Sequence, residues 1–279
     1  MSDFIGTKLT MNLGERSYDI IVKRGSLENL YQFARLDRRV AVVTDSGVPA
    51  QYAQMVADQC KDATIITVPQ GEASKSFKIL ETVLRQMLDF GMGRGDLVVA
   101  VGGGVVGDLA GFAASIYMRG IDFINCPTTT LSMIDSSIGG KTAVDLGDTK
   151  NIVGAFWQPK LVIVDPDTLS TLPRRHFING LAEAVKAGLL ADPELFSIFE
   201  KEDVDDRIGD IICRSLRFKK SIVEQDETEQ GMRKALNFGH TIGHGIEAVK
   251  GIKGRRTTGL FHGECVALGM LPMIESKAL

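Results

Sequence analysis

The chain has 279 residues, of which 44% are hydrophobic, and its 32 Lys and Arg nearly balance its 35 Asp and Glu. This composition excludes a disordered, collagen-like or disulfide-scaffold protein, and the net charge of -3 offers no basic surface for a nucleic acid. The length suits one large domain or two modest ones with a sizeable core. Glycine is unusually frequent, with 30 residues.

Two features predict the cellular compartment. The N-terminal segment has no basic region followed by an apolar one, and the four cysteines (Cys60, Cys126, Cys213 and Cys265) are widely separated. We therefore expect a cytoplasmic protein with reduced thiols and no secretory signal. The most apolar stretch, residues 97–117, contains Asp108 with four glycines just before it. This pattern favours a buried strand, turn and helix over a membrane span.

Short apolar runs alternate with helical patterns over the first 170 residues. In chain order we predict a strand over 39–44, a helix over 49–60, a strand over 63–68, a helix over 76–90, a strand over 97–101, a helix from about residue 108, and strands over 123–126 and 161–164. Because these strands are apolar throughout, they indicate a parallel sheet covered on both faces. The N-terminal part is therefore predicted to be a Rossmann-like α/β domain.

The pattern becomes helical after residue 171. Helices are predicted over 180–191, 193–201, 207–224 and 241–249, and the sequence shows no convincing strand there. We therefore predict two domains, an α/β domain over residues 1–170 and an all-α domain over residues 171–279.

A glycine-rich turn follows the strand predicted over 97–101. Residues 102–107 (GGGVVG) match G-x-G-x-x-G between a strand and a helix, which is the context in which such a turn binds a dinucleotide phosphate. Asp122 lies 20 residues beyond Gly102 but at the start of the next strand, so it fits the ribose-binding acid of the fingerprint poorly. A tight turn without a ligand is the alternative. Residues 136–142 (SSIGGKT) are a second candidate anion loop, but they lack the first glycine of a nucleotide triphosphatase loop.

Three of the four histidines cluster within the helical part. His240 and His244 are spaced to share one face of a helix, and His262 precedes Gly-Glu. Two or three imidazoles with a carboxylate from another helix suit a divalent metal, and structural histidines are the alternative. The fourth, His176, stands beside two arginines and is predicted to lie on the surface.

Basic side chains accompany these motifs at Lys141, Lys150, Lys186, Lys219 and Arg233. Any one of them is usually a solvated charge. Together with the glycine turn and the histidines they suit an anionic, phosphorylated substrate. Composition and spacing therefore predict a nucleotide- and metal-dependent enzyme acting on a small anion.

Six segments, taken in order, resemble the 3-dehydroquinate synthase family. They are residues 102–120 (GGGVVGDLAGFAASIYMRG), 127–145 (PTTTLSMIDSSIGGKTAVD), 150–159 (KNIVGAFWQP), 171–188 (TLPRRHFINGLAEAVKAG), 236–248 (LNFGHTIGHGIEA) and 262–270 (HGECVALGM). The resemblance runs from about residue 40 to the C-terminus. The block over 102–159 is specific to sugar-phosphate cyclases, whose fold also includes metal-dependent glycerol and alcohol dehydrogenases.

The resemblance implies a set of site residues and a homodimer. The metal, zinc or cobalt, would be held by Glu183, His240 and His262. The contacts to NAD would be Asp45, Glu72, Lys75, Gly104, Val105, Val106, Gly107, Asp108, Thr128, Thr129, Lys150, Thr168 and Thr171. The substrate contacts and catalytic residues would be Asp135, Lys141, Asn151, Lys186, Lys219, Arg233, Asn237 and His244. Arg119 would reach the substrate phosphate in the neighbouring subunit.

The implied reaction converts 3-deoxy-D-arabino-heptulosonate 7-phosphate to 3-dehydroquinate and phosphate, with NAD used and regenerated. Three alternatives stay open: another cyclase, such as a 2-deoxy-scyllo-inosose or valiolone synthase; a metal-dependent dehydrogenase that releases NADH; and a non-catalytic NAD-binding or dimerisation module. The basic segment 250–260 departs from the family pattern and is predicted to be a mobile loop. The chain also ends soon after the 262–264 motif, so we expect the helical domain to lack its last helices.

Overall fold

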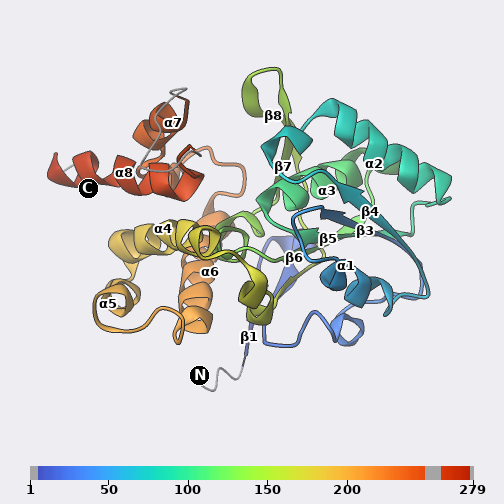
Figure 1. Ribbon diagram of the computed structural model, residues 1–279, viewed down its shortest axis with the longest axis horizontal. Helices are drawn as coiled ribbons and strands as arrows, with labels where there is room; N and C mark the ends of the chain where they lie inside the picture. Colours follow the sequence, from blue (N-terminus) through green and yellow to red (C-terminus); the bar gives the residue numbers. More distant parts are fainter. Residues whose placement is uncertain (1–5, 249–258, 277–279) are drawn as a thin grey trace.

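The computed structural model describes residues 6–248 and 259–276, and places an α/β layer beside a group of helices (Figure 1). The predicted loop over 250–260 therefore lies almost wholly outside the described residues. The main sheet has seven strands in the order β1-β2-β9-β6-β5-β3-β4. These strands are β1 (Thr7–Met11), β2 (Tyr18–Val22), β3 (Arg39–Asp45), β4 (Asp62–Val68), β5 (Leu97–Gly102), β6 (Asp122–Pro127) and β9 (Leu161–Val164). All neighbouring strands pair in parallel except β1 with β2.

The parallel sheet is confirmed, and its central strands are buried on both faces. Along β3, Val40 and Val42 pack with α1 (Ala50–Ala57), whereas Ala41 and Val43 pack with α2 (Phe77–Asp89) and α3 (Gly104–Ile116). A strand covered on both sides has no polar face, which is why β3, β5 and β9 are continuous apolar runs. The glycine turn after β5 therefore begins from a rigid, fully buried strand.

Two hairpins were not predicted from the sequence. The first, β1 with β2, adds an antiparallel strand at one edge of the sheet. The second, β7 (Lys141–Leu146) with β8 (Thr149–Phe156), forms a separate two-stranded sheet that packs on α3 (Figure 1). Most side chains of β1 and β8 are exposed or half-buried, so neither strand carries the apolar alternation by which a strand is recognised.

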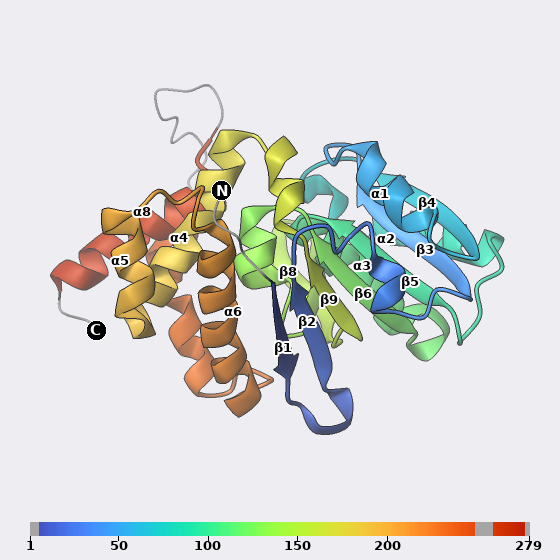
Figure 2. The same cartoon turned by 90° about the horizontal axis from the view of Figure 1, so that it is seen from below.

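The helical part consists of α4 (Arg174–Ala191), α5 (Pro193–Lys201), α6 (Ile208–Gln225), α7 (His240–Ala248) and α8 (His262–Glu275). The predicted helices all form, but α4 begins six residues earlier than predicted and α8 was missed. Figure 2 shows α6 beside β1 and β2, which it contacts. One hydrophobic core joins the two parts, because Tyr18 and Ile20 of β2 pack in the same cluster as Leu181 and Leu216.

None of the described helices is long and apolar enough to cross a membrane. The stretch over 97–117 forms β5, the glycine turn and α3, as the sequence predicted. The carboxyl ends of β3, β5 and β6 meet at one edge of the sheet, which is where open α/β sheets place their ligands. Both hollows described below open at this edge.

Candidate active site

The glycine turn forms one wall of a hollow of about 240 Å³. Helix α3 begins at Gly104, within the turn and earlier than predicted, so its unpaired N–H groups open into this hollow. A Cβ on Gly103 would lie 3.1 Å from the Thr129 methyl, and a Cβ on Gly104 would lie 3.0 Å from Ser136 Oγ. A side chain at either glycine would crowd its neighbour, so glycine keeps this part of the turn open, as a turn that binds a dinucleotide phosphate requires.

The two candidate acids of the dinucleotide fingerprint lie at opposite edges of the sheet. Asp122 begins β6 and forms an ion pair with Arg38 at 3.0 Å, away from the glycine turn, so it is not the ribose acid. Asp45 ends β3, which pairs directly with β5, and it lines the hollow. Its Oδ1 accepts the N–H of Gly47 at 2.7 Å. In the dinucleotide fingerprint the acid follows the glycine turn in the sequence. Here the strand beside β5 is β3, which precedes the turn, so the acid at its end does so too.

The structure divides the residues expected to contact NAD into four groups. Six of them line this hollow: Asp45, Gly104, Val105, Thr128, Thr129 and Thr171. Val106, Gly107 and Thr168 are buried below the surface. Glu72, Lys75 and Asp108 form a charged group in which Lys75 Nζ donates to Asp108 Oδ2 at 2.7 Å. Lys150 instead pairs with Glu247 on α7 at 2.7 Å.

A second, larger hollow of about 550 Å³ lies between the β7–β8 hairpin and the helical part. It is lined by all the expected substrate residues of this chain's own site: Asp135, Lys141, Asn151, Lys186, Lys219, Arg233, Asn237 and His244. These residues come from both parts of the chain, which the fold brings together. Arg119 lies outside both hollows, on the exposed turn after α3, where its φ is +69°.

Arg233 is the largest buried cation of this cavity, with 2% of its surface exposed. Its Nη2 donates to the Gly139 carbonyl at 3.0 Å, and its Nη1 donates to the Glu227 carbonyl. Gly139 has a φ of +96°, and a Cβ there would lie 2.5 Å from Arg233 Nη2. Burial lowers the pKa of Arg233 from its ordinary value, yet a guanidinium stays charged at neutral pH.

Lys219, which is buried, and Asp135, which is half-buried, form an ion pair on another wall. Lys219 Nζ donates to Asp135 Oδ1 at 2.7 Å and to its carbonyl at 2.8 Å. Burial opposes ionisation of Asp135, but Lys219 and Lys186 outweigh it and hold the pKa of the carboxyl below its usual range. Burial lowers the pKa of Lys219. The pair fixes a carboxylate and an ammonium side by side in the cavity.

The expected metal ligands meet at one end of this cavity. Glu183 Oε1 lies 3.6 Å from His240 Nε2 and 4.0 Å from His262 Nε2. Glu183 is 4% exposed, and its Oε2 pairs with Lys186. Its Oε1, by contrast, is buried and has no hydrogen-bond partner among the described residues. An unsatisfied buried carboxylate oxygen facing two imidazole nitrogens is the donor set that zinc or cobalt takes, so these residues fit a divalent ion.

Spacing alone could not separate His240 from His244, and the structure places them differently. His240 lies next to Glu183, whereas His244 is grouped with Glu247 and His262. Burial, with help from Lys186, lowers the pKa of His240 to about 4, and burial also lowers the pKa of His244. A hydrogen bond to Glu247 raises the pKa of His262. His240 is therefore neutral at pH 7, as metal ligation requires.

The sequence analysis missed several residues that shape the site. Glu229, at a φ of +60°, lines the cavity and binds both Lys141 and Asn237. It lies in a polar loop, where nothing in the local sequence distinguishes it from a solvated acid. Glu247 belongs to the 236–248 motif, but no role was assigned to it.

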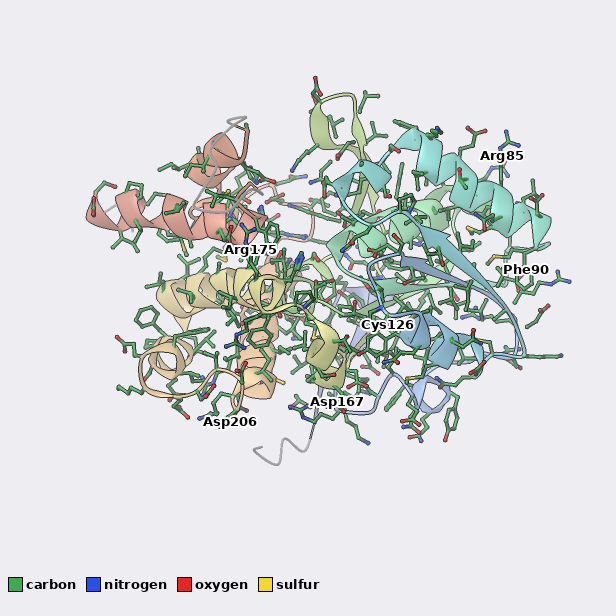
Figure 3. All side chains as sticks on the ribbon, in the orientation of Figure 1. Arg85, Phe90, Cys126, Asp167, Arg175 and Asp206 are labelled. Atoms are coloured by element: carbon green, nitrogen blue, oxygen red, sulfur yellow. The ribbon has the colours of Figure 1, made fainter. Side chains whose placement is uncertain are left out.

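A third missed group holds the start of α8 against α4. Arg175, labelled in Figure 3 between these helices, donates twice to Glu264, at 2.8 and 2.7 Å. The Asn179 side chain accepts the N–H of Gly263 at 2.8 Å, and a Cβ on Gly263 would lie 1.9 Å from the Asn179 carbonyl. His176, predicted to be a surface residue, instead stacks on the ring of Phe261 with centroids 4.7 Å apart and lines the smaller hollow. These contacts place His262 relative to α4.

Comparisons with known proteins agree with this geometry. A family model described as 3-dehydroquinate synthase N-terminal matches residues 65–179, and one described as 3-dehydroquinate synthase C-terminal matches residues 180–278. The 3-dehydroquinate synthase of Pelobacter propionicus is 44% identical over 276 residues, covering 94% of this chain and 76% of the relative. The 3-dehydroquinate synthase of Streptococcus mutans is 44% identical over 287 residues, covering 98% of this chain and 79% of the relative.

Two solved cyclase structures similar to this one hold NAD+ and a divalent ion, and a dehydrogenase structure shares the fold. A 2-deoxy-scyllo-inosose synthase in complex with carbaglucose-6-phosphate, NAD+ and Co2+ has a TM-score of 0.85 and 28% identity, covering 95% of this chain and 75% of that structure. A 2-epi-5-epi-valiolone synthase from Streptomyces hygroscopicus with NAD+ and Zn2+ bound has a TM-score of 0.79 and 30% identity, covering 93% and 74%. A probable glycerol dehydrogenase from Sinorhizobium meliloti, at 19% identity and a TM-score of 0.61, shares the fold.

Proposed function

Because the chain belongs to the 3-dehydroquinate synthase family, we propose that it converts 3-deoxy-D-arabino-heptulosonate 7-phosphate to 3-dehydroquinate and phosphate. The reaction is a lyase step of the shikimate pathway, which leads to chorismate and the aromatic amino acids. It proceeds by transient oxidation with NAD, β-elimination of phosphate, reduction and an intramolecular aldol closure.

The buried guanidinium of Arg233 is the observation that carries this proposal. Among the described residues it binds two backbone carbonyls, and no carboxylate lies within hydrogen-bond reach of it. A buried guanidinium that lines a cavity and has no carboxylate hydrogen-bonded to it favours an anionic ligand there. The substrate has a carboxylate and a phosphate. We assign their recognition to Arg233 together with Lys141 and Lys186, which line the same cavity.

We assign the divalent ion, zinc or cobalt, to Glu183, His240 and His262, and NAD to the hollow beside the glycine turn. When bound, the ion supplies a Lewis acid for a substrate alkoxide and NAD supplies a temporary hydride acceptor. The unpaired Oε1 of Glu183 and the close approach allowed by Gly103 and Gly104 support these assignments.

The remaining cavity residues orient the substrate and move protons. Asn151 and Asn237 present amides that hold hydroxyl groups in place. His244, whose pKa is lowered by partial desolvation at the cavity wall, relays protons during ring opening and closure. The Lys219–Asp135 pair presents a fixed ammonium and carboxylate to the substrate. The substrate's own phosphate serves as the base that removes the proton in the elimination.

Alternative activities fit less well. The related cyclases share the parts that bind NAD and metal, but the family models and the curated relatives are 3-dehydroquinate synthases. The presence of Lys141, Arg233 and Asn237 in the cavity also favours a substrate with a carboxylate. A dehydrogenase would release NADH at each turnover, which gives a direct way to distinguish the two activities.

We further propose a cytoplasmic homodimer with two domains in each subunit. The four cysteines are unpaired, which supports a reducing compartment. Arg119 is exposed and outside both cavities of its own chain, which supports a contact with the substrate phosphate of a second subunit. The domain boundary is placed near residue 170, between β9 and α4.

The test is release of phosphate from the heptulosonate 7-phosphate, measured with added Zn2+ or Co2+ and with a chelator. We expect turnover that the chelator abolishes, without accumulation of NADH. His262→Ala should lose turnover while its affinity for NAD is unchanged, and Glu275→Gln, an exposed carboxylate on the same helix, is the matched control. Steady accumulation of NADH would favour the dehydrogenase, and full turnover by His262→Ala would contradict the metal site.

A further inference from the structure

Glu247 on α7 lies between a proposed metal ligand and the β7–β8 hairpin. Its Oε2 is 3.5 Å from His262 Nδ1, and its Oε1 accepts a hydrogen bond from Lys150 Nζ at 2.7 Å. Lys150 belongs to β8 and His262 begins α8, so one carboxylate joins three elements that are far apart in the sequence.

The two nitrogens of His262 face carboxylates on opposite sides of the ring. Nε2 faces Glu183 Oε1 at 4.0 Å, and Nδ1 faces Glu247. His240 has a parallel arrangement, because its Nε2 faces Glu183 and its Nδ1 lies 3.3 Å from the Phe238 carbonyl. A neutral imidazole has one proton and one lone pair, and an acceptor behind Nδ1 keeps the proton there and leaves Nε2 free to ligate.

We propose that Glu247 is a positioning residue of the metal centre: it accepts the Nδ1–H of His262, directs Nε2 towards the ion, and is itself anchored by Lys150. This inference rests on the proposed function, which places the ion at Glu183, His240 and His262. It also gives Lys150 a role as the anchor of this carboxylate, since the structure places it against α7 and outside the lining of the smaller hollow.

The same residues could instead form a second metal site, because His244, Glu247 and His262 also lie within ligating distance of one another. The existing contacts favour the positioning role. Both oxygens of Glu247 already have partners, one in Lys150 and one in His262. Glu183 Oε1, by contrast, has none among the described residues. A cation bound at Glu247 would also lie next to the ammonium of Lys150, which repels it.

The experiment measures the affinity of the whole chain for Zn2+ and for Co2+ by competition with a chromophoric chelator. The wild-type chain should bind one ion, and Glu247→Ala should weaken that affinity about 10- to 100-fold. Glu247→Gln keeps an acceptor oxygen for the Nδ1–H of His262, so its affinity for the ion should lie between those of the wild type and Glu247→Ala. Lys150→Met removes only the anchor of Glu247, so its affinity for the ion should fall less than that of Glu247→Ala. Glu275→Gln at the exposed end of α8 is the control and should bind like the wild type.

Two further readouts separate positioning from a general loss of structure. Thermal unfolding of the metal-free Glu247→Ala protein should match that of the metal-free wild type, and the visible absorption bands of the Co2+-loaded variant should change. Equal affinities of Glu247→Ala and wild type would overturn the inference while leaving the proposed metal site intact. Two ions in the wild type and one in Glu247→Ala would establish the second site instead. A wild-type chain that binds no ion would refute both the proposed metal site and this inference.

Discussion

Replacing Gly139 by alanine tests whether this turn holds the buried guanidinium in the substrate cavity. Gly139 has a φ of +96°, and a Cβ there would lie 2.5 Å from Arg233 Nη2 and 3.3 Å from the Val223 side chain. Arg233 is 2% exposed and lines the substrate cavity, so its guanidinium can shift only within that cavity. It must move away from the Gly139 carbonyl, to which it now donates at 3.0 Å.

Gly139→Ala is expected to lower the folding stability in two ways. An alanine forced to a positive φ costs about 1–2 kcal/mol of folding free energy. Losing one charge-assisted hydrogen bond inside the protein costs about 1.5–3 kcal/mol more. The total of about 2.5–5 kcal/mol corresponds to a Tm lower by roughly 4–9 °C for a chain of this size. If the displaced guanidinium no longer meets the substrate anion, the loss of that separate charge-assisted contact, of about 1.5–3 kcal/mol, lowers kcat/KM about 10- to 150-fold.

Gly147→Ala is the matched control for the backbone cost. Gly147 has a φ of +60°, and no atom lies within 4 Å of a Cβ built there. This variant should lose about 1 kcal/mol of stability and keep kcat/KM near that of the wild type. Thermal unfolding and phosphate-release kinetics measure the two quantities separately. If both variants lost the same stability and both kept full kcat/KM, the turn would not be what positions Arg233.

Further predictions concern the acids at the two edges of the sheet, two glycines in the helical part and an acid in the loop after α6. Asp122→Asn should leave the affinity for NAD unchanged, whereas Asp45→Asn should weaken it roughly tenfold in a fluorescence titration. If both variants lost the same affinity, Asp45 would not be the acid that contacts the ribose. Gly263→Ala, whose methyl would overlap a carbonyl of α4, should cost about 1–3 kcal/mol or more of unfolding free energy. Gly245→Ala, at an exposed position within α7, should raise the free energy of unfolding by about 0.5–1 kcal/mol in the same denaturant titration. A lower free energy of unfolding in this variant would be evidence against a regular helix. Three backbone N–H groups hold the pKa of Asp226 below its ordinary value of 3.8, so its contribution to stability is full above that value and is lost as the pH falls through the lower folded pKa. Asp226→Asn should therefore be less stable at neutral pH and should flatten the fall of Tm in acid, and an unchanged acid profile would count against this assignment.

The extent to which the fold could be predicted depended on how local its signals are. The strand over 161–164 and the helix over 193–201 form with the predicted bounds, because a short apolar run and a Pro at a helix start act within a few residues. Strand β1 of the edge hairpin and strand β8 of the β7–β8 hairpin are largely exposed or half-buried. Their strands are defined by pairing with a partner, and that partner leaves no periodic apolar pattern in the sequence.

The sequence by itself determined which chemical groups the site contains: a glycine turn after a buried strand, three clustered histidines and a set of lysines and arginines. Only the tertiary structure decided which of them meet. Two histidines four residues apart look equivalent along the chain, but only His240 faces the unpaired oxygen of Glu183, which comes from a different helix. In the same way, the acid beside the glycine turn is Asp45, upstream of it, because β3 and β5 are neighbours in the sheet. Contacts of this kind depend on packing between distant segments, which no local sequence pattern records.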